Sequence, residues 1–279
     1  MANIFYSQTY TGQPVTVVEF TPSTRADWVN NMISALLAAG WTQTSGSGTD
    51  MVLGSGTTPD NLKYKVRIWD PGSGNCARVG LRNWNETLLN DGLGMFCLPG
   101  GFTWKVVASA YQFVAWVPGS TAGRTFVMAT APKLEPAVNY NITTAAYLAS
   151  NDIDDSSTSS RPSLRDRTYC GGRVGMVLNN DALFSGVQDV SRNLLLYTPA
   201  GVNSDFREWI DGSRDVLEAR VKFHPTTLPK WLGYLWDAML VYAVMAPDQT
   251  VTWDGRTWIS LTANNVTDNA LGTVCLLVS

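Results

Sequence analysis

Apolar residues recur every three to four positions between about Thr24 and Ala39, which predicts an amphipathic helix over this range. Ser23 is expected to cap its first turn, and Asp27 adds a carboxylate there. Gly40 is placed to end the helix in the left-handed conformation. The apolar stripe must pack on another layer of the fold, and it consists of Trp28, Val29, Met32, Ile33, Leu36 and Leu37.

The segments that follow the helix have the composition and the alternation of β-strands, over residues 41–44, 51–53 and 64–69. In the third segment, the side chains of alternate residues from Tyr64 to Ile68 share one face, while Lys65 and Arg67 lie on the other. This pattern is typical of a half-exposed antiparallel strand. Turn-forming residues at 70–75 then predict that 64–82 is a β-hairpin.

Two further hairpins are predicted by strand-like runs on either side of a turn. Tyr111–Val117 is joined to Arg124–Ala129 by a turn rich in glycine, serine and threonine. Asp254 and Gly255 have the two-residue turn chemistry that connects 251–253 to 256–258.

The C-terminal part of the chain is predicted to be mostly β. Its strands are expected at Arg173–Leu178, Asn193–Tyr197, Val216–Phe223, Val251–Trp253, Trp258–Thr262 and Val274–Val278. The segment 228–246 fits two structures. Trp231, Leu235 and Trp236 fit a short helical face, whereas Leu240–Val244 fits a strand.

Residues 136–170 have a different character and are expected to form a linker or extended loop. Asp152, Asp154 and Ser156 alternate as calcium ligands would, but Ser157 and Ser163 stand where an EF-hand needs glycine and glutamate. The predicted fold is α+β and predominantly antiparallel β. A helix-plus-sheet module at 1–135, with the helix packed on the sheet, precedes the loop, and a second β-rich module follows at 171–279.

The charge content is unusually low, because charged residues make up 15% of the chain and an ordinary soluble protein has about 25%. A net charge of −3 argues against a general nucleic-acid binder, and we expect no sequence-specific nucleic acid partner. The longest apolar runs, such as Met239–Ala246, are too short for a membrane span.

Low charge with 11 tryptophans and 24 glycines favours a protein that functions in an assembly. The alternative is a monomer whose surface is covered by serine, threonine, asparagine and glutamine.

The cysteines and the single histidine form no metal-site pattern. Cys76, Cys97, Cys170 and Cys275 include no CxxC pair, so structural zinc is not expected. The chain begins MANIFYSQ, without the basic start and apolar run of a secretory signal. We therefore expect it to fold in a reducing cytoplasm, with its cysteines as free thiols. The sequence does not decide whether Cys76 pairs with Cys97 in a disulfide. His224 alone cannot build a multi-histidine metal site.

No catalytic motif is present, since the chain has no GxGxxG, GxxxxGK[ST], HExxH or GxSxG signature. Glu208, Asp211 and Asp215 form the densest acidic group outside the 136–170 segment, as a carboxylate glycosidase would need. Arg207 and Arg214 lie among them, which favours a solvated turn with local ion pairs. We therefore expect no enzyme and no cofactor.

Exposed tryptophans could stack on sugar rings, so the tryptophan content also raises a carbohydrate-binding function. Burial is the commoner fate of a tryptophan in or beside an apolar strand. We expect it for Trp41, Trp69, Trp104 and Trp116.

The helix ending Ala38-Ala39-Gly40-Trp41-Thr42, the strand at 64–69 and the hairpin at 111–129 together resemble virion proteins of tailed bacteriophages. Gln249–Trp258, with its Asp-Gly turn followed by Thr-Trp, is similar to the closing strands of such proteins. The 136–170 segment departs from their pattern. The resemblance implies a tail, neck or baseplate component, present in several symmetric copies in the virion after synthesis in the host cytoplasm, and without catalysis.

The leading hypothesis is therefore a phage structural protein that contacts itself and other virion proteins. The residues proposed for the contact between subunits are Trp231, Leu235, Trp236, Trp253 and Trp258. The alternative is a host-surface carbohydrate-binding adhesin, and a glycosidase acting on the host envelope is the least favoured function.

Overall fold

The computed structural model describes the chain from residue 11 onward, with gaps. The described residues are 11–73, 76–82, 93–96, 102–118, 126–131, 145–150, 175–179, 188–189, 194–197, 216–223, 230–241, 248–253, 255–261 and 273–279.

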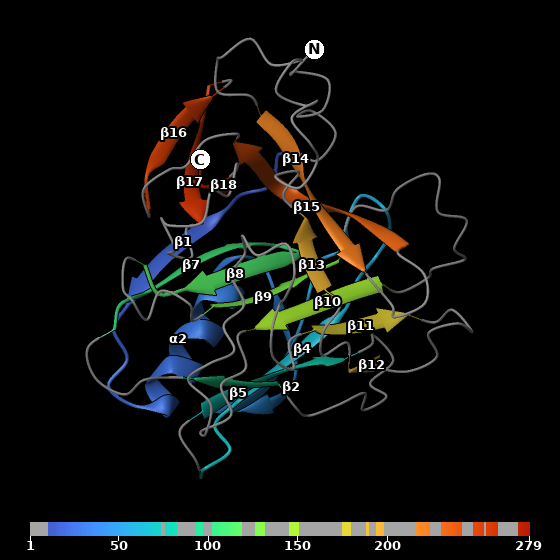
Figure 1. Ribbon diagram of the computed structural model, residues 1–279. Helices are drawn as coiled ribbons and strands as arrows, with labels where there is room; N and C mark the ends of the chain where they lie inside the picture. Colours follow the sequence, from blue (N-terminus) through green and yellow to red (C-terminus); the bar gives the residue numbers. More distant parts are fainter. Residues whose placement is uncertain are drawn as a thin grey trace.

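These residues form one helix, α2 (Arg25–Ala38), and three antiparallel sheets (Figure 1). The central sheet has the order β1 (Thr16–Phe20), β7 (Trp104–Ser109), β8 (Gln112–Trp116), β9 (Phe126–Thr130), β10 (Ala145–Ser150), β11 (Gly175–Asn179) and β12 (Gln188–Asp189). The helix-side sheet has the order β2 (Thr42–Ser47), β3 (Asp50–Gly54), β4 (Lys65–Trp69), β5 (Cys76–Arg82) and β6 (Leu93–Phe96). The C-terminal sheet has the order β13 (Leu194–Tyr197), β14 (Val216–Phe223), β15 (Lys230–Val241), β18 (Thr273–Leu277), β17 (Arg256–Leu261) and β16 (Thr250–Trp253). The predicted α+β class, rich in antiparallel β, is confirmed.

The caps of α2 follow from the residues at its two ends. Thr24 is the N-cap, and its side chain accepts a hydrogen bond from the Asp27 backbone N–H at 3.0 Å. The expected cap, Ser23, instead donates its hydroxyl to the Asp27 carboxylate. This hydroxyl and Thr24 together lower the pKa of Asp27. Gly40, at φ +91°, ends the helix as predicted, in a Schellman arrangement with Trp41 N–H donating to Leu36 O at 3.0 Å.

The apolar stripe of α2 is buried, with one exception. Trp28, Met32 and Leu36 have no exposed surface. Leu37, which the helical period included in the stripe, is 41% exposed, and Ala35 is buried. The helix approaches β1 and β7 of the central sheet and β3, β4 and β5 of the helix-side sheet.

Alternate residues of β7 point to opposite sides of the central sheet. Trp104 and Val106 belong to the core cluster that contains α2, and the Trp104 ring meets Trp28 edge-on at 5.4 Å. On the other side of the sheet, Lys105 contacts the C-terminal part of the chain, and Ser109 faces that part. Both faces of β7 are therefore covered, which explains why this strand is buried along its whole length.

Trp41 connects the helix-side and central sheets. Its ring lies edge-on to Tyr64 at 5.4 Å and to Phe113 at 5.9 Å, and its indole N–H donates to Ser109 O at 2.8 Å. The Tyr64 hydroxyl donates to Tyr111 O at 3.0 Å. The predicted burial is confirmed for all four tryptophans, whose exposed fractions are 3% for Trp41, 7% for Trp69, 1% for Trp104 and 4% for Trp116.

The three predicted hairpins are confirmed by the pairing of β4 with β5, β8 with β9 and β16 with β17. The half-exposed pattern expected for β4 is wrong at Lys65, which is only 5% exposed. Arg67 stays partly exposed, pairs with Asp50 at 2.7 Å and lies over the Trp69 ring. The ambiguous segment forms a strand, β15, from Lys230 to Val241.

The range 136–170, expected to be a linker or extended loop, contains β10, which pairs with β9 and β11. Its Ala145–Ser150 run is thus part of the central sheet. Residues 151–170, including Asp152, Asp154 and Ser156, lie outside the described residues. The module boundaries at 135 and 171 stay a prediction. Within the part of the chain that is described, no helix has the length and apolar character of a membrane span.

Candidate functional site

A bulge in β15 lies where the C-terminal sheet meets the central sheet. Glu218 pairs with Met239, and Arg220 pairs with Tyr234, so four residues of β15 lie opposite the single residue Ala219. Extra residues of this kind leave the ladder and re-aim their side chains. Here Trp236 and Asp237 are re-aimed, whereas Ala238 stays paired with Leu276 of β18, and Asp237 has φ +48°.

Trp236 joins this bulge to the central sheet. Its indole N–H donates to Ala131 O at 2.7 Å, and its ring lies 6.1 Å from that of Tyr111. Its own backbone oxygen accepts a hydrogen bond from Gln112 Nε2. The Gln112 Oε1 in turn accepts from Thr130 Oγ1 at 3.2 Å. A buried glutamine is satisfied here because both ends of its amide have partners.

Asp237 binds the segment that leads into β1. Thr11 donates its backbone N–H to Oδ1 at 2.8 Å and its hydroxyl to Oδ2 at 2.7 Å. Asp237 is 2% exposed, and this burial raises the pKa of its carboxyl, although the Thr11 hydrogen bonds and the charge of Arg256 oppose the shift. Burial also raises the pKa of the Tyr111 hydroxyl, and the nearby Asp237 charge adds to that shift.

A second polar contact joins the same two sheets through Lys105. Its ammonium lies 2.8 Å from Glu19 Oε1 and 3.3 Å from Asp248 Oδ2, in the residues before β16. Burial would lower the pKa of Lys105, but the hydrogen bonds and charges of the two carboxylates outweigh this and raise it. The two sheets are therefore joined by the neutral hydrogen bonds at Trp236 and by the ionic contact of Lys105 with Asp248.

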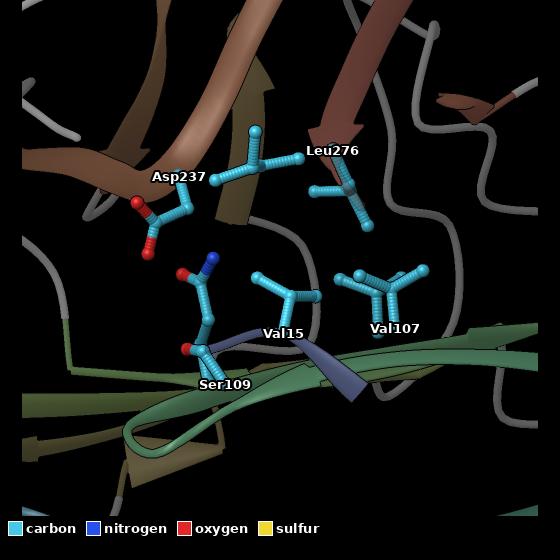
Figure 2. A pocket seen from close by; sticks show the side chains of 8 residues that line it. Val15, Val107, Ser109, Asp237 and Leu276 are labelled. Carbon is cyan, nitrogen blue, oxygen red and sulfur yellow. The ribbon is translucent and has the colours of Figure 1, made fainter. Parts of the chain in front are cut away.

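A small cavity lies beside Asp237, between the central and C-terminal sheets (Figure 2). In Figure 2, Asp237 and Leu276 approach it from the C-terminal sheet, while Ser109, Val107 and Val15 approach it from the opposite side. About 10 Å³ is open to the centre of a water molecule, which is room for roughly one water. Its remaining lining residues are Gln112, Val114 and Leu277. This volume suits a joint between sheets and excludes an organic substrate.

Two of the predicted subunit-contact residues are buried inside the chain. Trp236 is 3% exposed and Trp258 is 1% exposed, so the structure assigns both to internal packing instead of the expected surface contact. Trp253 is partly exposed, and its role stays a prediction. Trp231 and Leu235 lie in β15, but their side chains are outside the described residues.

One sequence signal points to the joint between the sheets. Asp237 is a single carboxylate inside the apolar run 231–241, and such a residue in a strand needs a partner.

Cys275 is a fully buried thiol, and burial raises its pKa to about 12. His224, Glu208, Asp211 and Asp215 lie outside the described residues. Among the residues that are described, no group of three or more His, Cys, Asp or Glu side chains could hold a metal ion.

No protein-family model matches the chain, and no curated protein sequence matches it.

Proposed function

We propose that the protein is a structural component of a tailed-bacteriophage particle, assembling in multiple copies in the tail, neck or baseplate. In this proposal it contacts itself and other virion proteins and performs no catalytic step. The N-terminal helix packed on its sheets forms one module, and the C-terminal sheet forms the other. The proposal is supported by the sequence resemblance, the low charge and the open edge of β16.

The edge at β16 carries the proposal. The backbone N–H of Thr257 donates to Ser279 O at 2.8 Å, and its backbone oxygen accepts a hydrogen bond from Val278 N–H at 2.9 Å. Both backbone groups of Thr257 therefore point towards the residues after β18. Thr252, its partner across the β16–β17 pair, therefore directs its own N–H and C=O away from β17. Thr250 has the same orientation, two residues earlier.

This edge suits pairing with another strand. Thr250 and Thr252 are exposed, and the four residues of β16 include no charge and no proline, the features that natural proteins use to block an edge. Within the described residues, β16 pairs with β17 alone. A second copy of β16, related by a two-fold axis, would satisfy these backbone groups and bring Trp253 of each subunit to the contact.

The proposal is tested in purified particles of the phage that encodes the chain. Mass spectrometry of density-purified virions is expected to find the protein in several copies per particle. Supplied in trans during infection, the Thr252→Val variant should be incorporated and Thr252→Pro should not, because proline removes the outward N–H while valine keeps it. Absence of the wild-type protein from purified virions overturns the proposal.

A host-surface carbohydrate-binding adhesin is the second candidate, and the partial exposure of Trp253 is the observation that favours it. The other tryptophans with described side chains offer no stacking surface, since none is more than 7% exposed. Saturable quenching of tryptophan fluorescence by host polysaccharide, lost in Trp253→Ala, would support this function over the first.

A further inference from the structure

We propose that the cavity between the central and C-terminal sheets is a binding site for one structural water molecule, held between Ser109 and Asp237. This site is independent of the proposed function, because it rests on the joint between sheets within one chain.

The first observation is the side chain of Ser109. The residue is 3% exposed, and its hydroxyl oxygen is buried without a hydrogen-bond partner. Its backbone oxygen is already used by the Trp41 indole. A buried hydroxyl that makes no hydrogen bond is rare, because it loses water and gains nothing in return.

The second observation is the chemistry of the cavity that Ser109 lines. Asp237 and Gln112 line the same space, with apolar walls from Val107, Val114 and other residues (Figure 2). Each carboxylate oxygen of Asp237 accepts one bond from Thr11 and can accept more. The Gln112 amide nitrogen has a second N–H besides the one given to Trp236.

The size of the cavity selects the ligand. Room for roughly one water excludes any organic group. A water can donate to the Asp237 carboxylate, exchange a hydrogen bond with the Ser109 hydroxyl and accept from the Gln112 amide. These make three bonds, the number that buried waters typically form. The water would link β7 and β8 of the central sheet to the bulge of β15.

A crystal structure of the wild-type chain tests the proposal directly. We expect an ordered water within about 2.7–3.2 Å of Ser109 Oγ and of an Asp237 carboxylate oxygen. The proposal is overturned by a cavity without such density, by a Ser109 hydroxyl bonded to a protein group, or by a metal ion at shorter distances.

Oxygen-17 relaxation dispersion of water tests it in solution, since it detects waters that stay buried. Ser109→Val fills the space and removes the hydroxyl, so we expect the loss of one long-lived water. Ser45→Val makes the same change at an exposed strand position and should leave the signal unchanged. An equal signal from the wild type and the Ser109 variant contradicts the proposal.

Discussion

The indole N–H of Trp236 donates to the carbonyl oxygen of Ala131 at 2.7 Å, across 105 positions of the sequence. This bond connects the bulge of β15 to the end of β9, and both residues are buried. Trp236→Phe removes the donor and leaves the Ala131 oxygen buried. We expect a loss of about 1–3 kcal/mol in the free energy of unfolding, measured by urea denaturation. Trp253→Phe, at a partly exposed position, is the control and should cost clearly less; equal losses would show that the bond contributes nothing specific.

The pH dependence of stability should reveal the buried carboxyl of Asp237. Because burial raises its pKa in the folded protein above 3.8, the folded state binds this proton more tightly than the unfolded state does. The contribution of the Asp237 carboxyl to the free energy of unfolding is thus fully present below pH 3.8, and it is lost as the pH rises through the raised pKa. The pKa of Tyr111, raised above 10, keeps its hydroxyl neutral between pH 4 and 7.

Asp237→Asn isolates this effect. Asparagine tolerates positive φ and keeps an oxygen for Thr11, but it has no proton to gain. The stability of the variant minus that of the wild type should be largest at pH 7 and should fall towards pH 4, as measured by urea unfolding at each pH. A difference that grows on acidification would mean that the pKa of Asp237 is lowered instead.

Two glycines of the β2–β3 hairpin form a matched pair. Gly46 has φ +83°, and a Cβ there would lie 2.2 Å from the Asp50 backbone oxygen, whereas Gly48 has φ +58° with open space around it. Gly48→Ala should lower the free energy of unfolding by about 1–2 kcal/mol, which is the strain of a residue in the left-handed conformation. Gly46→Ala should lower it further, because the backbone at Asp50 must also move. Thermal unfolding of both variants checks the order, and a reversed order would contradict the hairpin geometry.

The thiol of Cys275 should be unreactive in the folded protein. With its pKa raised to about 12, roughly one thiol in ten thousand is ionised at pH 8, and none of its surface is exposed. Alkylation by iodoacetamide, followed by trypsin and mass spectrometry, reports on it through the peptide 257–279, which contains no other cysteine. We expect modification only after denaturation in urea. Equal labelling of the folded and denatured protein would contradict the burial of β18.

Local features of the sequence predicted the local structure well. The spacing of Trp28 and Met32 predicts α2, Gly40 predicts its end, and the Asp-Gly turn predicts the β16–β17 hairpin, since each depends only on neighbouring residues. The helix cap differed by one residue because Ser23 and Thr24 have the same capping chemistry.

The joint between sheets was not predictable in the same way. It depends on the register of β14 against β15, where a bulge opposite Ala219 turns Trp236 and Asp237 towards residues more than 100 positions away. No short-range pattern encodes that register. For the same reason, the tryptophan content suggested a surface contact for Trp236 and Trp258, although the fold buries both.

The proposed assembly of the chain with copies of itself through the edge of β16 is tested by the solution mass. Light scattering across a concentration series should give a multiple of 30.4 kDa for the wild type and for Thr252→Val. Thr252→Pro should give 30.4 kDa with an unchanged circular dichroism spectrum. A wild-type mass of 30.4 kDa at every concentration would contradict the account.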